Sequence, residues 1–178
     1  MAQPGKNCGD LNVLYEMEEG LRSQSIPTSI IRAAYYFSNW DAMLKPAADD
    51  GVLSTMYPVH LRIPMVAPAD LGRVAASLLT ESAEATGLHY VEGPEWYSSG
   101  DVAAAFSKAL GRAVRVVVSP RAQWKQMFRD LGFSDTAAAS YAPMTAVSVD
   151  GDFDAPDTPV RGSVSLERHI EKLVKTAT

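Results

Sequence analysis

Cysteine is almost absent from the 178-residue chain, which has Cys8 alone. A single thiol excludes an internal disulfide, and this favours a reducing compartment. Long hydrophobic runs are missing too, because no stretch approaches the roughly 18–20 apolar residues that span a bilayer. The first residues lack the apolar segment of a signal peptide. We therefore expect a cytoplasmic protein with no membrane-inserted part.

Clusters of positive charge are also missing. The 16 lysines and arginines are scattered along the chain, and 21 acidic residues give a net charge of −5. Domains that bind nucleic acid carry a basic patch, and anionic membranes attract basic segments. The sequence therefore predicts neither nucleic acid nor a membrane as a partner.

Metal-ligand and nucleophile motifs are lacking as well. The three histidines, His60, His89 and His169, are far apart in the sequence, and there is neither a cysteine pair nor an H-E-x-x-H. The G-x-S-x-G turn of serine hydrolases does not occur. We expect no bound metal and no serine nucleophile.

Glycine-rich phosphate-binding turns are the absence that bears most on function. No two of the 12 glycines stand two residues apart, so the chain contains no G-x-G, and it contains no P-loop. Dinucleotide-binding folds use such a turn to bring the pyrophosphate against backbone N–H groups at a helix N-terminus. We therefore expect no tight binding of NAD or NADP by this chain alone.

Apolar side chains recur at spacings of three and four in five segments, which predicts five amphipathic helices. The third follows Ser98, which forms a capping-box pattern with Asp101. The fourth has Ser119 at the N-cap and Pro120 at the first helical position. Gly111 and Gly132 end the third and fourth helices. The apolar stripes of the five helices are Leu14, Met17, Leu21; Leu71, Val74, Ala75, Leu78, Leu79; Val102, Ala105, Phe106, Ala109, Leu110; Trp124, Met127, Phe128, Leu131; and Leu166, Ile170, Leu173, Val174.

Short segments at 29–32, 62–66, 88–91 and 114–118 predict strands, and residues 146–160, rich in Asp, Pro and Gly, predict a loop. Pro64 has no N–H, which predicts that its strand lies at a sheet edge. Alternating helices and strands indicate an α/β fold with a largely parallel sheet. A doubly wound sheet has about five or six strands, so the few strands here indicate part of a larger fold.

Four blocks of the sequence resemble motifs that occur together in one protein family. Residues 11–40 are similar to "E-x-x-L-R-x-S-G-L-P", "T-I-L-R-P" and "G-F-F-M-E-N-W". Residues 62–79 are similar to "I-P-W-V-D-x-x-D-I-A-x-V-A-A-x-L-L", residues 89–98 to "Y-x-L-x-G-P-E-x-Y-S", and residues 110–120 to "L-G-R-P-V-R-V-V-x-V-P". In this order, over nearly the whole chain, the blocks resemble the NmrA-like family of atypical short-chain dehydrogenases/reductases.

The resemblance implies a partial Rossmann-like fold that lacks the N-terminal dinucleotide-binding strands and has a small C-terminal α/β lobe. Residues 1–178 would form a single substrate-side domain. Intact relatives bind NADP or NAD, and they either reduce small electrophilic compounds such as quinones or act as redox sensors. The implied function is the substrate-binding half of a truncated oxidoreductase, inactive alone. The alternative is a non-catalytic redox-sensing or regulatory protein that acts through protein contacts.

The resemblance assigns no catalytic residue. Short-chain dehydrogenases use a Tyr as proton donor and a Lys four residues later to lower its pKa. When Glu18 is aligned with the family's helix glutamate, Asp10 stands at the Tyr position and Leu14 at the Lys position. Neither residue can take over these roles, so the sequence leaves open whether the chain is an enzyme.

The aromatic loop at residues 33–40 is the candidate site. In the family, the backbone after this strand borders the nicotinamide, which implies cofactor contacts at Ala34, Tyr35 and Tyr36. The following side chains lie near the substrate, which implies substrate contacts at Tyr36, Asn39 and Trp40. The competing interpretation is that Tyr35, Phe37 and Trp40 only pack beneath the lobe, as aromatic side chains usually do.

The predicted strand at 29–32 also bears on assembly. The resemblance implies that its neighbour in the family's sheet is not in this chain. An unpaired strand edge is a template for another chain, so we expect a homodimer, a domain-swapped pair or pairing with the missing N-terminal half, or else marginal stability with aggregation. The competing interpretation is that residues 1–10 fold back and cover the edge. A small-molecule ligand is the other expected partner.

Overall fold

Residues 8–9, 11–80, 86–153 and 155–177 are described by the computed structural model of the chain. Its helices are Leu11–Arg22 (α1), Leu44–Asp50 (α2), Pro68–Thr80 (α3), Ser99–Leu110 (α4), Trp124–Asp130 (α5), Asp135–Val149 (α6) and Leu166–Ala177 (α7), with 3-10 turns at Phe37–Met43 (η1) and Arg121–Gln123 (η2). Its strands are Ser29–Ala33 (β1), Tyr35–Tyr36 (β2), Val52–Thr55 (β3), Ile63–Val66 (β4), Gly87–Glu92 (β5), Trp96–Tyr97 (β6), Arg115–Val118 (β7) and Val160–Arg161 (β8).

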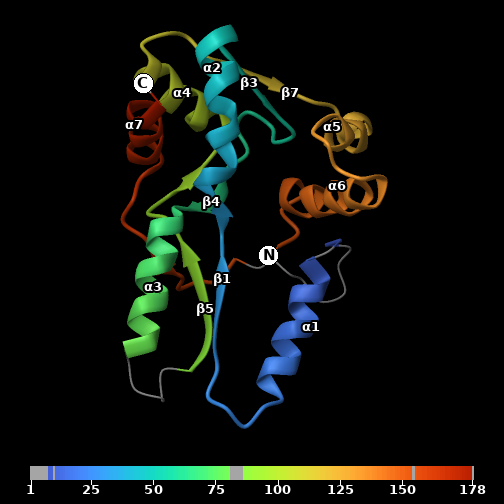
Figure 1. The fold of residues 1–178 in the computed structure, drawn as a ribbon, viewed down its shortest axis with the longest axis vertical. Coiled ribbons are helices and arrows are strands. Elements are labelled where there is room, and N and C mark those ends of the chain that lie inside the picture. The colour runs from blue at the N-terminus through green and yellow to red at the C-terminus, as the bar shows by residue number, and fades with distance from the viewer. Residues whose placement is uncertain (1–7, 10, 81–85, 154, 178) are drawn as a thin grey trace.

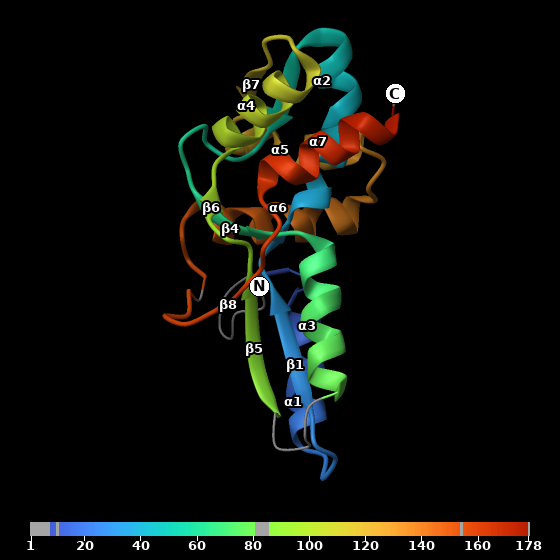
Figure 2. The same ribbon diagram turned by 90° about the vertical axis from the view of Figure 1, so that its left-hand side faces the viewer.

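The strands form three small sheets, ordered β1-β5-β8, β2-β4-β6 and β3-β7. All pairs are parallel except β4 with β6. Helices α3 and α1 lie on opposite sides of the β1–β5 pair (Figures 1 and 2). The predicted α/β class with largely parallel strands is therefore confirmed, and β1 is the first strand of its sheet in the described residues.

Sequence patterns located most of these elements. Strands β1, β4, β5 and β7 match the four predicted strands within two residues at each end. The capping box of α4 is present, because the Asp101 N–H donates to Ser98 Oγ at 3.1 Å and the Ser98 N–H donates to Asp101 Oδ2 at 2.8 Å. These reciprocal bonds satisfy two helix N-terminal donors.

The prediction that Pro64 lies in an edge strand was wrong, because β4 is the middle strand of β2-β4-β6. The two neighbours pair with different parts of β4. Met65 and Val66 face β2, whereas Ile63 and Pro64 face β6. Pro64 thus has a neighbouring strand on one side only, and its missing N–H interrupts no second ladder.

The predicted start of the fourth helix was also wrong. The Ser119 N–H donates to the Thr55 carbonyl at 2.8 Å, and the Ser119 carbonyl accepts from the Trp124 indole at 3.0 Å. Ser119 therefore extends the pairing of β7 with β3 and does not cap a helix. The 3-10 turn η2 follows, and α5 begins only at Trp124.

The predicted loop at 146–160 was wrong in its first four residues, which end α6, and in Val160, which begins β8. Helix α6 mixes small, polar and apolar residues around its axis and includes Pro143, so it has no periodicity of 3.6. A helix without an apolar stripe escapes a search based on spacing. Turn η1, helix α2 and strand β3 were not predicted either.

The main core lies between η1, the β2-β4-β6 sheet, α4 and α7, around Phe37, Phe106, Leu53, Met65 and Ile170. A smaller core of Ala34, Val66 and Val91 packs beneath α3. No helix within the described ranges is long and apolar enough to cross a membrane.

Asp70 holds the segment before α7 in place through hydrogen bonds to its backbone. Its buried carboxylate accepts the backbone N–H groups of Ser163 and Val164, both at 3.1 Å, and pairs with Arg73. A Cβ at Gly162 would overlap this carboxylate. Downstream, His169 Nε2 lies 2.7 Å from Asp41 Oδ1, which links α7 to η1.

Replacing Asp70 with Asn is expected to destabilise the fold by about 2–3 kcal/mol, because the amide keeps one acceptor oxygen and loses the charge that three donors face. Chemical unfolding measures the change. The matched control is Asp49→Asn, since Asp49 makes an exposed pair with Lys45 and should change stability by less than about 0.5 kcal/mol. Equal losses in the two variants would contradict the role given to Asp70.

Candidate functional site: a groove along strand β1

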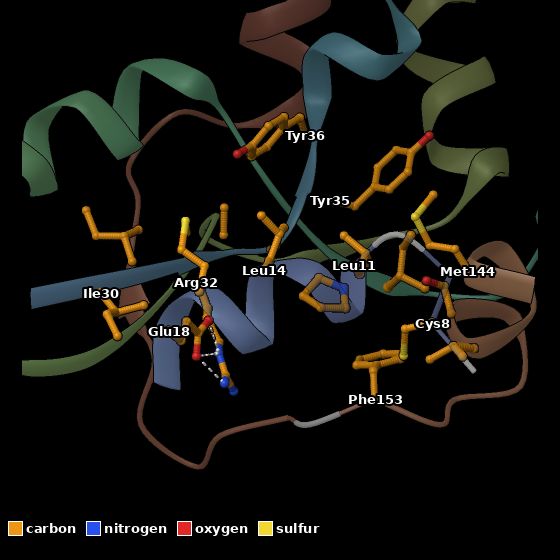
Figure 3. A pocket seen from close by; sticks show the side chains of 18 of the residues that line it. Cys8, Leu11, Leu14, Glu18, Ile30, Arg32, Tyr35, Tyr36, Met144 and Phe153 are labelled. Atoms are coloured by element: carbon orange, nitrogen blue, oxygen red, sulfur yellow. Dashed lines mark hydrogen bonds and ion pairs between the residues drawn. The ribbon is translucent and has the colours of Figure 1, made fainter. Parts of the chain in front are cut away.

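A groove of about 520 Å³ runs along β1, between α1 on one side and α6 on another (Figure 3). At one end lie Ile30 and Arg32 with the apolar face of α1; we call this the strand section. At the other end the groove passes the carboxyl end of β1 and is lined by Ala34, Tyr35, Tyr36 and Asn39. We call this end the ligand section. The lining residues are Cys8, Leu11, Leu14, Met17, Glu18, Leu21, residues 29–36, Asn39, Ile63, Pro64, Met144, Val147, Ser148 and Phe153.

The strand section is an apolar wall opposite an open strand. The side chains of Leu14, Met17 and Leu21 lie along α1 at spacings of three and four, and they are 46%, 55% and 40% exposed. The spacing predicted from the sequence placed these residues on one face, as found. That face lines the groove and is left largely uncovered by the described residues.

An ion pair joins α1 to β1 at the floor of the strand section. Arg32 Nε donates to Glu18 Oε1 at 2.9 Å, and Arg32 Nη2 donates to Glu18 Oε2 at 2.5 Å. Arg32 Nη1 donates to the Tyr90 hydroxyl at 2.8 Å. Both charged side chains are buried, and the hydrogen bonds with Glu18 raise the pKa of Arg32. These are the glutamate and arginine of the two sequence motifs quoted for residues 11–40.

The ligand section contains four of the five predicted site residues. Ala34, Tyr35, Tyr36 and Asn39 line the groove. Tyr35 and Tyr36 are neighbours in β2 and point to different sides (Figure 3). The Tyr35 hydroxyl is hydrogen-bonded to Asn39, and burial raises its pKa. Tyr36 is 41% exposed, so its hydroxyl is the more accessible of the two.

Trp40 is placed differently from the other predicted residues. It is buried and does not line the groove, and its ring lies 5.9 Å from that of Tyr35 and 6.3 Å from that of Tyr57. Its indole N–H has no hydrogen-bond partner within the described part of the chain. Trp40 and Tyr57 therefore pack against Tyr35 and do not line the groove themselves.

Several groove residues were not found from the sequence. Met144, Val147 and Ser148 come from α6, and Phe153 and Cys8 come from the segments next to it and to α1. No sequence signal marked α6 as a helix, so nothing placed these side chains at β1. Asp10, which takes the family's Tyr position, lies outside the described residues, and Leu14 lies on the groove wall.

Comparison with family models shows a match to the NmrA-like family over residues 13–174. The chain belongs to the NmrA-like family. Comparison with curated proteins gave no match.

Solved structures support the same fold for this NmrA-like chain. An NADPH-dependent quinone oxidoreductase of Escherichia coli in complex with NADPH has a TM-score of 0.72 at 20% identity over 95% of this chain and 61% of its own. A triphenylmethane reductase of Citrobacter has a TM-score of 0.75 at 17% identity over 93% and 59%. A nucleoside-diphosphate-sugar epimerase of Staphylococcus aureus has a TM-score of 0.68 at 17% identity over 96% and 61%. The chain thus spans about three fifths of these proteins.

The described lining of the groove in this NmrA-like chain includes no glycine-rich phosphate-binding turn. A pyrophosphate needs backbone N–H groups at a glycine-rich turn, and the sequence has no G-x-G. Among the described residues that line the groove, the one arginine or lysine is Arg32, and it is engaged by Glu18. Within the described ranges, no group of His, Cys, Asp and Glu side chains is arranged to hold a metal ion.

Removing one member of the buried pair is expected to be costly. Arg32→Met leaves buried Glu18 with only its longer contact to Arg22, at 3.4 Å, and should cost about 3–5 kcal/mol of stability, whereas Glu18→Leu/Arg32→Met should recover most of the loss. Urea unfolding of the two single variants and the double variant gives the coupling. Glu19→Leu, at an exposed pair with Arg22, is the control at less than about 1 kcal/mol. Additive losses in the double variant would refute the pairing.

Stability should also fall at alkaline pH. Burial raises the pKa of Tyr57 from 10.0 to about 12, against an opposing effect of its hydrogen bond with Ser148. Between these values the unfolded state has lost the proton and the folded state keeps it. The contribution of protonated Tyr57 to the free energy of unfolding is therefore complete below pH 10 and is lost as the pH rises towards 12.

Unfolding measured from pH 8 to 12 tests this effect of Tyr57. Tyr57→Phe should make the fall above pH 10 shallower, and the part that remains belongs to Tyr35, whose pKa burial also raises. Ser148→Ala keeps the tyrosine and should keep the fall. An unchanged slope in Tyr57→Phe would assign the alkaline loss to other groups.

Proposed function

We propose that residues 1–178 form the substrate-side part of an NmrA-like oxidoreductase, in which the ligand section binds a small, uncharged, largely apolar molecule. The observation that carries the proposal is the groove itself, which is lined both by Tyr36 and Asn39, just after the carboxyl end of β1, and by apolar side chains of α6. Ligands of open α/β sheets bind at the carboxyl ends of the strands.

The charges around the groove support a neutral ligand. Arg32 is neutralised by Glu18, and the chain has a net charge of −5. A carboxylate or phosphate entering the groove would lose its water without gaining an unpaired cation from the described lining residues. An uncharged carbonyl or hydroxyl group can instead bond to the Asn39 amide or to the Tyr36 hydroxyl. Two of the similar structures are named as a quinone oxidoreductase and a triphenylmethane reductase. Both names refer to flat or ring-containing organic substrates, which is consistent with a largely apolar ligand.

Two naphthalene ligands of matched shape test the proposal. We expect 2-acetylnaphthalene, which is neutral, to bind at least about tenfold more tightly than 2-naphthoate, which is an anion at neutral pH. Asn39→Ala should weaken the neutral ligand about fivefold, the effect of one lost hydrogen bond. Gln126→Ala, at an exposed position of α5 that does not line the groove, is the control. Ligand-observed NMR measures both affinities, and tighter binding of the anion would overturn the proposal.

The same proposal holds that NADPH is not bound tightly by this chain alone, because the chain has no phosphate-binding turn. Calorimetric titration should show no dissociation constant in the low micromolar range. Pure protein should not oxidise NADPH in the presence of duroquinone, a fully substituted quinone that does not alkylate thiols. A low micromolar constant, or steady turnover abolished by Tyr36→Phe, would contradict this part.

A second candidate function is regulation through protein contacts without catalysis. The uncovered apolar face of α1 favours it, since exposed apolar patches mark interaction sites. Translating the DNA immediately upstream of the first codon distinguishes the two. An in-frame glycine-rich turn would favour the oxidoreductase, and the lack of one would favour the regulator.

A further inference from the structure

Turn η1 carries Asn39 into the ligand section, although it is a weak element by itself. It is a 3-10 helix of seven residues, and the side chain of Tyr36, which precedes it, makes no capping hydrogen bond. Runs of 3-10 helix longer than three or four residues are uncommon, because their hydrogen bonds have poorer geometry than those of an α-helix. Contacts with other elements therefore have to hold η1 in place.

Helix α7 supplies two such contacts through one side chain, His169. Its Nε2 lies 2.7 Å from Asp41 Oδ1, and its ring lies 5.7 Å from that of Phe37. In the sequence, Phe37 stands two residues before Asn39 and Asp41 stands two residues after it. The imidazole thus contacts η1 on both sides of the residue that lines the groove.

The bond between His169 and Asp41 is suited to holding the turn. A carboxylate can only accept, so His169 Nε2 carries the hydrogen and donates it. Hydrogen bonds that a carboxylate accepts are stronger than those between two neutral groups. The His169 side chain is 18% exposed and does not line the groove, so it can act on a ligand only through η1.

We propose that His169 is a positioning residue for the ligand section, because its hydrogen bond with Asp41 holds η1 where the Asn39 amide meets the bound molecule. The inference rests on the proposed function, in which Asn39 bonds a neutral ligand. It adds that α7 sets how tightly this ligand is bound, although no residue of α7 lines the groove.

Ligand-observed NMR with 2-acetylnaphthalene tests the inference. His169→Leu removes the donor and keeps an apolar side chain beside Phe37, and it should weaken binding about three- to fivefold. His169→Gln keeps an N–H donor and should bind within about twofold of the unaltered chain. Glu171→Ala is the matched control, since Glu171 joins α7 to Lys108 of α4, and it should also stay within about twofold.

The double variant Asn39→Ala/His169→Leu separates positioning from a general loosening of the fold. Because His169 acts through Asn39, the double variant should bind no more weakly than Asn39→Ala alone. Additive losses would overturn the inference. Equal losses in His169→Leu and Glu171→Ala, or no rescue by His169→Gln, would overturn it too.

A measurement without ligand keeps this inference distinct from the proposed function. The Asn39 side-chain amide signals, assigned by their loss in Asn39→Ala, should shift or broaden in His169→Leu and stay unchanged in His169→Gln and Glu171→Ala. Asp41→Ala removes the same bond from the other side and takes the place of His169→Leu if circular dichroism shows that variant to be unfolded. If the unaltered chain does not bind 2-acetylnaphthalene, the proposed function fails and the amide signals alone decide. Unchanged signals in His169→Leu or Asp41→Ala would overturn the role of His169.

Discussion

The buried pair of Glu18 and Arg32 is the interaction on which the groove depends. It joins the middle of α1 to β1, two elements separated by the exposed turn that begins at Ser23. Burying two charges costs more than their attraction returns unless the geometry is good and the remaining donors are satisfied. Here both carboxylate oxygens and Tyr90 accept from the guanidinium. The pair thus holds α1 in place while its apolar face stays open to the groove.

A second set of polar contacts positions the other wall. Asp70 fixes the chain before α7, and His169 of α7 bonds Asp41 while its ring lies 5.7 Å from that of Phe37. Phe37 and Asp41 both belong to η1, the turn that carries Asn39. The contacts therefore run from α3 through the C-terminal helix to the ligand section, and they place an exposed amide on a well-packed turn.

The spacing of apolar residues explains which parts of the fold and of the groove could be predicted from the sequence. Helices α1, α3, α4 and α7 have one apolar face, so spacing revealed them, and the helix glutamate and strand arginine stood in motifs that locate Glu18 and Arg32. Helix α6 mixes small, polar and apolar residues around its axis without an apolar stripe, so it was not predicted, and neither was the groove wall formed by Met144 and Val147. The cap at Ser119 failed because Ser119 continues the strand pairing with β3 and a 3-10 turn with Pro120 at its N-cap comes before α5, which local sequence does not reveal.

The alternation of side chains along β2 divides the aromatic loop into two roles. Two neighbouring tyrosines cannot face the same side of a strand, and here Tyr35 packs at an angle of 71° against Tyr57, with its hydroxyl bonded to Asn39. Tyr36 turns the other way and keeps an exposed hydroxyl. The packing interpretation and the ligand interpretation of residues 33–40 are therefore compatible. Tyr35 and Trp40 form the support, and that support leaves Tyr36 and Asn39 as the accessible polar groups at the carboxyl end of β1.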